Sequence, residues 1–138
     1  MNAITEFRGN YRWLSNFWSC KVVLDGVEYP SVENAYQAAK FHPSSREPFR
    51  TCTAKEAKAR GRKTAIEHQT QVGVLPQEDY DRARVGTMTL LLRQKFAPGT
   101  ELGLALRHTG DAEIIEGNTW GDTFWGVCDG VGQNWLGK

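Results

Sequence analysis

The chain has 138 residues and a formal net charge of +1 at pH 7, and this length suits one compact domain better than two. The near-neutral charge excludes the strong positive field of an obligate nucleic-acid binder, and no apolar run approaches the length of a membrane span. Because the first residues show neither the apolar core nor the cleavage site of a signal peptide, we expect a single cytoplasmic domain over residues 1–138.

The first predicted element is a β-hairpin over residues 20 to 29, CKVVLDGVEY. Two apolar runs flank Asp25-Gly26, a dipeptide suited to a tight turn with positive φ. Ser31 is then a good N-cap for a helix that Pro43 limits on its far side. An apolar stripe at i, i+3, i+4 and i+7 supports this helix and consists of Val32, Ala35, Tyr36 and Ala39.

A second face of the same helix carries Glu33, Gln37 and Lys40 at i, i+4 and i+7. The more common interpretation of such a pattern is a solvent-exposed polar face with weak local pairing. The functional interpretation is one wall of a cleft, with Glu33 as acid, base or electrostatic stabiliser and Lys40 as anion binder or nucleophile. Spacing alone does not choose between the two.

Residues 42 to 52 are expected to form a loop. Thr53 with Glu56 forms a capping-box pattern, which predicts a basic helix starting there. A connection over residues 70 to 76 follows. The segment 77–96 then has the longest helical pattern, and we expect it to be the main core helix. Its predicted apolar face comprises Tyr80, Ala83, Met88, Leu91, Leu92 and Phe96.

The rest of the chain predicts a short helix over residues 100 to 108, a short strand in AEIIE at 112 to 116, and a tail rich in glycine and tryptophan. The glycines would weaken any regular helix there, so the tail predicts a shaped loop region. The tryptophans either fill the core or offer stacking faces to a planar ring. More of the chain is predicted to be helix than strand, which indicates a mainly α protein of the α-rich α+β class. Carboxylates among these aromatic residues are Glu116, Asp122 and Asp129.

Metal and cofactor chemistry has no sequence signature here. The histidines and cysteines have no metal-ligand spacing, so we expect no metal, no cofactor and reduced thiols. No GxSxG, Walker-type or HExxH motif occurs. GVGQNWLG has only two of the spaced glycines of a dinucleotide fingerprint, which is weak evidence. The residues by themselves therefore indicate a small α-rich domain with a pocket for a planar ligand.

Several motifs in series resemble the NADAR family, also called YbiA-like. In order they are LSNFW, LDGVEYPSVENAYQAAKF, KEAKARGR, LLLRQKF, LRHTGDAEIIEGN and WGDTFWGVCDGVGQNWLG. The resemblance runs from about Phe7 to Gly137. It implies a single, mainly helical domain that cleaves N-glycosidic bonds in nucleotide-like substrates. The two substrate classes it implies are ribosylamino-pyrimidine phosphates of early riboflavin synthesis and ADP-ribose attached to a base such as guanine in DNA.

The same resemblance implies site residues. The catalytic candidates are Glu33, Lys40 and Asp122. Two routes remain open: a carboxylate of Glu33 or Asp122 activates water, or Lys40 attacks the sugar as a neutral amine. The rival hypothesis is a binding module that holds a nucleotide or ADP-ribose without cleaving it. The implied substrate-binding residues are Asn16, Phe17, Tyr36, Gln37, Trp125, Gly126 and Asn134.

Overall fold

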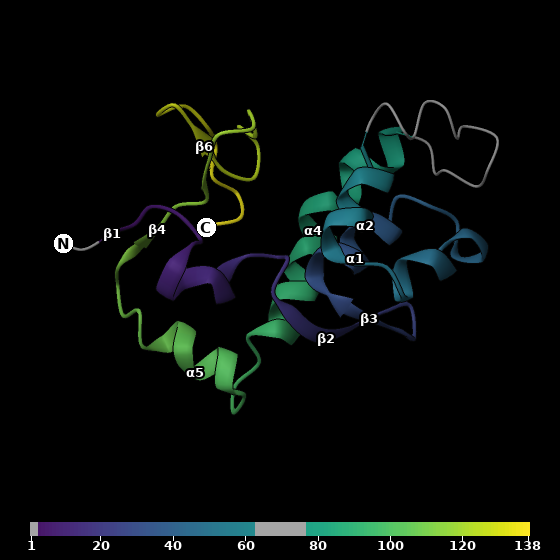
Figure 1. The fold of residues 1–138 in the computed structure, drawn as a ribbon, viewed down its shortest axis with the longest axis horizontal. Coiled ribbons are helices and arrows are strands. Elements are labelled where there is room, and N and C mark those ends of the chain that lie inside the picture. The colour runs from purple at the N-terminus through teal and green to yellow at the C-terminus, as the bar shows by residue number, and fades with distance from the viewer. Residues whose placement is uncertain (1–2, 63–76) are drawn as a thin grey trace. The chain divides into compact units, whose positions relative to one another are not determined.

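A computed structural model describes residues 3–62 and 77–138 of the chain, shown as a ribbon in Figure 1. The chain divides into two compact units. The larger unit comprises residues 16–103, and the smaller unit joins the first 15 residues to residues 104–138. The predicted connection over residues 70 to 76 lies outside the described residues. Whether the chain is one domain, as the sequence predicts, stays a prediction.

The larger unit begins with the expected hairpin. Strands β2 (Ser19–Leu24) and β3 (Val27–Ser31) pair in antiparallel register. Asp25 and Gly26 have φ values of 50° and 79°. Positive φ at both central residues is what a type I′ turn needs, and this turn matches the natural twist of a hairpin. The local sequence therefore determines the register of the two strands.

Helix α1 (Val32–Ala38) follows the hairpin directly, and Ser31 caps it as predicted. The Ser31 hydroxyl accepts a hydrogen bond from the Asn34 backbone N–H at 3.0 Å. All seven residues of α1 are buried. The Asn34 side-chain amide donates to the backbone oxygens of Phe49 and Cys52, each at 2.9 Å. These bonds attach the following segment to the helix.

The segment after α1 is more regular than expected. The structure places two 3₁₀ turns, Pro43–Ser45 and Glu47–Arg50, where the sequence predicted a loop. A proline at the start of each turn fits the fixed φ of the first helical positions. Phe41 and Phe49 pack against each other with ring centroids 5.1 Å apart, so apolar burial also holds this segment.

Helix α2 (Ala54–Arg60) starts at the predicted capping box, with both reciprocal bonds between Thr53 and Glu56 present. The longest described helix, α4 (Gln77–Lys95), is also where the sequence predicted it. It contacts α1 and β2. No helix within residues 3–62 and 77–138 has the length and apolarity to cross a bilayer.

The predicted apolar face of α4 is only partly buried. Met88 and Leu91 are fully buried, whereas Leu92 and Phe96 are half-buried and Ala83 is exposed. The prediction was therefore wrong for Ala83, because α4 is covered only along a narrow seam. Near the end of α4 the Gln94 amide pairs with both backbone groups of Val23, at 2.7 and 2.8 Å. The side chain of Tyr80 lies outside the described residues.

The smaller unit is built from very short strands. Strand β1 (Ala3–Ile4) pairs in parallel with β4 (Glu113–Ile114), and β5 (Gly117–Asn118) pairs in parallel with β6 (Val127–Cys128). Strand β4 lies inside the predicted AEIIE strand. The chain also forms a 3₁₀ segment at Gly9–Leu14. Helix α5 (Glu101–Arg107) occurs where a short helix was predicted and crosses the division between the units. The described residues thus fit an α-rich α+β class.

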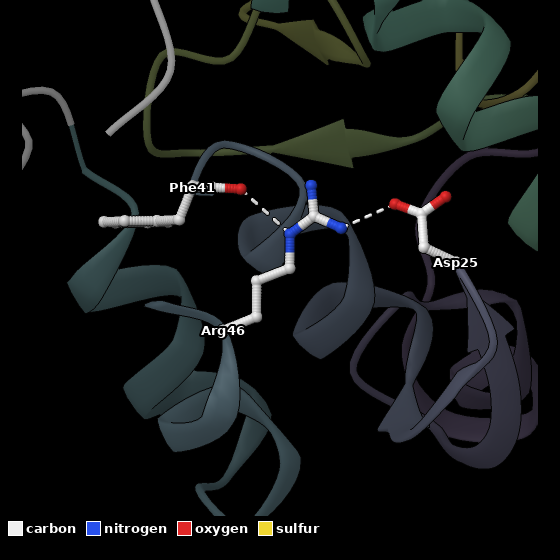
Figure 2. A network of polar contacts seen from close by, with 3 residues as sticks. All are labelled: Asp25, Phe41 and Arg46. Atoms are coloured by element: carbon white, nitrogen blue, oxygen red, sulfur yellow. Dashed lines mark hydrogen bonds and ion pairs between the residues drawn. The ribbon is translucent and has the colours of Figure 1, made fainter. Parts of the chain in front are cut away.

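A buried arginine links the hairpin turn to Phe41, which lies just after α1 (Figure 2). The Arg46 guanidinium donates to the Phe41 backbone oxygen at 2.9 Å and pairs with the Asp25 carboxylate at 2.6 Å. Arg46 is 8% exposed. Its planar fork serves two acceptors in different directions, which a lysine amine could not reproduce at this site.

Replacing Arg46 with alanine is expected to lower the free energy of unfolding by about 2–3 kcal/mol, because two charge-assisted bonds of a buried guanidinium are lost. Urea unfolding followed by circular dichroism measures this loss. Arg50→Ala is the matched control. Arg50 pairs with Glu47 at 3.0 Å on the exposed surface, so its loss should change stability by less than about 1 kcal/mol. Equal effects of the two substitutions would contradict the prediction.

Candidate active site

The polar face of α1 is buried. Glu33 is 8% exposed and Gln37 is 6% exposed, while Lys40, just after the helix, is half-buried. The more common interpretation of the sequence, a solvent-exposed polar face, is therefore wrong. Burial occurs because α2 and α4 both contact α1. Polar groups buried in this way need partners or a function.

Glu33 and Gln37 are directly bonded. The Gln37 Nε2 donates to Glu33 Oε2 at 2.6 Å, as their i, i+4 spacing on a helix allows. The Glu33 backbone N–H donates to the Asn16 backbone oxygen at 3.0 Å. The start of α1 is thus tied to the segment that carries Asn16 and Phe17. Glu33 also lies in the first turn of the helix, where the dipole favours a carboxylate.

Two buried oxygens near this face have no hydrogen-bond partner among the described residues. They are Asn16 Oδ1 and Gln37 Oε1. Asn16 is 8% exposed, and its amide nitrogen contacts Met88 Sδ at 3.6 Å. An unpaired buried acceptor costs about 1–3 kcal/mol, so two in one region require an explanation. Both oxygens are acceptors that the described residues leave unsatisfied.

Lys40 has its amine held in a partly buried position. Its Nζ donates to the Gly61 backbone oxygen at 2.9 Å and lies 5.4 Å from the centre of the Tyr36 ring. Burial lowers the pKa of Lys40 to about 8, the nearby Glu33 charge partly opposes this, and Arg84 adds to it. At pH 7 about a tenth of such a lysine is a neutral amine, far more than for an exposed lysine.

The two aromatic candidates of the larger unit differ in exposure. Tyr36 is 4% exposed and belongs to the core, with its ring beside the Lys40 amine. Phe17 is 41% exposed, and the Lys58 ammonium lies 5.7 Å from its ring centre. Phe17 can therefore offer a ring face to a ligand, whereas Tyr36 shapes the surroundings of Lys40.

In the smaller unit, Asp122 organises a turn. Its Oδ1 accepts from the backbone N–H groups of Phe124 and Trp125, at 3.1 and 2.9 Å. Asn118 in turn holds Asp122, because its side chain bonds both the backbone N–H and the backbone oxygen of that residue. Asn118 is not among the site residues predicted from the sequence. Its place just after a glycine at the end of a short strand is not a distinctive signal.

The other candidates of the smaller unit lie around this turn. The Trp125 and Phe124 rings meet edge to face, 4.7 Å apart. A side chain at Gly126 would overlap Glu116, whose backbone oxygen would lie 2.1 Å from the added carbon. The Asn134 side chain bonds the Ile114 backbone oxygen and the Glu116 backbone N–H. Gly126 and Asn134 therefore hold the turn together, and their predicted contact with substrate stays a prediction.

A cavity of about 360 Å³ opens beside the Asp122 turn, within the size range of small-molecule pockets. Asn118 forms part of its wall. Glu6 and Arg8 bring one negative and one positive charge to the lining, and Thr5 and Thr119 add hydroxyl groups. Within the parts of the chain that the structure describes, no group of three metal-type side chains could hold a metal ion.

The structure thus gathers the predicted residues into two groups, each inside its own unit. Asn16, Glu33, Gln37 and Lys40 are linked through α1 and its neighbours in the larger unit. Asp122, Trp125, Gly126 and Asn134 surround one turn of the smaller unit. Gly61, which binds Lys40, was also missed, because a glycine after a helix normally indicates only its end.

The chain belongs to the NADAR domain family, whose model matches residues 5–138. A Vibrio vulnificus protein named riboflavin biosynthesis protein is 35% identical over 130 residues, which are 94% of this chain and 34% of that protein. N-glycosidase YbiA of Shigella sonnei is 30% identical over 131 residues, which are 93% of this chain and 76% of that protein. The chain therefore spans about a third of the first relative and three quarters of the second.

A solved structure is also similar. The NMR structure of the Escherichia coli protein YbiA matches with a TM-score of 0.78 at 28% sequence identity. The match covers 99% of this chain and 80% of that one. The family predicted from the motifs in series is therefore confirmed, and the fold is YbiA-like.

Proposed function

We propose that this protein is an N-glycosidase that hydrolyses the C1–N bond of a ribosyl group in a nucleotide-like substrate. One observation carries the proposal: a half-buried lysine with its pKa lowered to about 8 follows a helix whose buried face holds the Glu33–Gln37 pair. A lysine that is partly neutral at pH 7 is a nucleophile, and a carboxylate can move the protons that its reaction requires. The relatives named N-glycosidase support the same reaction class.

In the favoured route, the neutral Lys40 amine attacks C1 while the bond from C1 to the base nitrogen breaks. The leaving nitrogen takes a proton. The bond from C1 to the ring oxygen then breaks as that oxygen takes a proton, and the lysine nitrogen, having lost its protons, forms an imine with C1. Glu33 is the carboxylate that carries these protons. Water then adds to the imine carbon, which releases the lysine and leaves the sugar as an aldehyde that closes again.

The alternative route needs no covalent intermediate. Glu33 takes a proton from water as the water attacks C1, and the positive charge that develops on the sugar is stabilised by the carboxylate. Lys40 then binds a phosphate or hydroxyl oxygen of the substrate. The lowered pKa of Lys40 favours the first route, because a lysine that only binds anions gains from staying fully charged.

The unpaired oxygen of Asn16 suits a sugar. It is an acceptor, so it requires a partner that donates a hydrogen bond. Ribose hydroxyls are such donors, and a purely anionic ligand is not. We therefore propose that the Asn16 amide holds a ribose hydroxyl, while the exposed ring of Phe17 stacks on the base. Gln37 acts on the same site through its hydrogen bond to Glu33.

The test is a mass-spectrometric screen with two kinds of substrate: a ribosylamino-pyrimidine phosphate and a DNA oligonucleotide carrying ADP-ribose on guanine. We expect release of the intact base together with free ribose phosphate or ADP-ribose from at least one of them. Tight binding of either substrate without release would contradict the proposal and favour a non-catalytic binding module. The name of the Vibrio relative makes the pyrimidine substrate the first to try.

A further inference from the structure

We infer that Gly61 is a positioning residue for the reaction proposed above, on which this inference rests. Gly61 contacts both Lys40 and Gln37, two residues of the candidate site. Its backbone oxygen accepts the hydrogen bond of Lys40 Nζ at 2.9 Å. Its missing side chain leaves the space that the Gln37 amide occupies while that amide donates to Glu33.

Backbone conformation does not explain the glycine. Gly61 has φ −88° and ψ 2°, which alanine can adopt. Space does explain it. A β-carbon at Gly61 would lie 1.7 Å from Gln37 Oε1, 2.6 Å from Gln37 Cδ and 3.2 Å from Gln37 Cγ. These three nearest atoms all belong to one flexible side chain, so an added methyl group would displace the Gln37 amide rather than the backbone.

The consequence falls on Glu33. Gln37 Nε2 bonds to Glu33 Oε2 at 2.6 Å, and the unpaired Gln37 Oε1 faces Gly61. Displacing the amide removes this donor from the carboxylate. The bond from Lys40 to the backbone oxygen of residue 61 does not depend on a side chain and is kept. Gly61→Ala therefore disturbs the bond between Gln37 and Glu33 and leaves the bond between Lys40 and the backbone oxygen of residue 61 in place.

The first test is the kinetics of Gly61→Ala on the substrate found in the screen. We expect kcat to fall by about 10-fold to 100-fold, because the carboxylate loses its orientation. Gly86→Ala is the matched control, since a β-carbon at Gly86 in α4 would meet no atom within 4 Å. Its kcat should equal that of the wild type.

A double-mutant cycle with Gln37→Ala separates positioning from a general structural role. Gln37→Ala removes the atoms that a methyl group at residue 61 would meet. Gly61→Ala should therefore have no further effect on kcat in the Gln37→Ala background. An equal loss in both backgrounds would overturn the inference. Should Gly61→Ala alone fail to fold, the double variant is expected to fold, and unfolding of both would also overturn it.

The second test needs no substrate. In a ¹⁵N NMR spectrum, the side-chain amide signal of Gln37 is identified by its loss in Gln37→Ala. We expect this signal to move in Gly61→Ala and to stay unchanged in Gly86→Ala. An unmoved signal in folded Gly61→Ala would overturn the inference whatever the activity. Absence of turnover in the wild type would instead count against the proposed function, so the two failures are distinguishable.

Discussion

Lys40→Arg is expected to lower kcat by about 10⁴-fold or more while substrate binding is retained, because losing a covalent nucleophile has effects of this size. Arginine keeps the positive charge but is never a neutral amine near pH 7. Lys40→Met serves as a second variant, because it removes the amine without placing a larger charged group in a buried position. Rates are measured by release of the base, and folding by thermal melts.

Lys95 provides the matched control for this prediction. It is buried in α4 at 3% exposure, and burial lowers its pKa to about 8, like that of Lys40. It lies 5.0 Å from the Phe96 ring centre. Lys95→Met is expected to keep near wild-type turnover. A comparable loss in Lys95→Met would indicate that burying a lysine, rather than the position of Lys40, determines the effect.

Trapping distinguishes the covalent route from direct attack by water. Borohydride added during turnover reduces an imine to a stable amine, so a ribosyl or ADP-ribosyl adduct should appear on the peptide that contains Lys40. The peptide that contains Lys95 should remain unmodified. A wild-type enzyme that turns over and yields no lysine adduct in repeated trials would leave Lys40 as a binding group. The carboxylate of Glu33 would then activate water.

The pH dependence follows from the same amine. Lys40 is charged below its pKa of about 8 and neutral above it. If the neutral amine attacks, kcat/KM should rise with pH and level off above about 8. An exposed lysine would place this rise near pH 10.4. A rate that falls as pH passes through 8 would instead indicate that the charged form of Lys40 is required.

Features governed by neighbouring residues were predictable from the sequence. Asp25-Gly26 correctly predicted the hairpin turn, and Ser31 correctly predicted the start of α1. Both features depend on only one or two residues, because a positive φ and an N-cap are local requirements. The capping box at Thr53 and Glu56 is equally local. Each of these bonds is made within a few residues, so the residue types and their spacing are sufficient.

Features that depend on packing were not predictable. The i, i+4, i+7 spacing of Glu33, Gln37 and Lys40 is the same on an exposed face and on a buried one. Only the contacts of α1 with α2 and α4 distinguish the two cases. The pairing of β1 with β4 joins opposite ends of the chain through strands of two residues, which are too short to show a period.

Glu33→Gln is expected to reduce kcat by about 10²-fold to 10⁴-fold, the usual range for losing a proton-transferring group. Glutamine has nearly the same shape, so the fold and the packing of α1 should be kept. Glu28→Gln is the control, since Glu28 is an exposed carboxylate of the hairpin, 3.7 Å from Lys21. It should have no effect on turnover. Near-normal activity of Glu33→Gln would remove Glu33 from the chemistry.

The same variant tests how Glu33 and Lys40 interact. The negative charge of Glu33 raises the pKa of Lys40, in opposition to burial. Removing that charge should therefore move the pKa of Lys40 below about 8. The folded protein is treated with acetic anhydride at a series of pH values, and the extent of Lys40 modification is then measured on the peptide isolated after digestion. This pH profile reports the pKa of Lys40 without any substrate. If the pH dependence of Lys40 modification is the same in Glu33→Gln as in the wild type, the two groups do not share one site. A shift to lower pH combined with lost turnover would assign both effects to one carboxylate beside the nucleophilic amine.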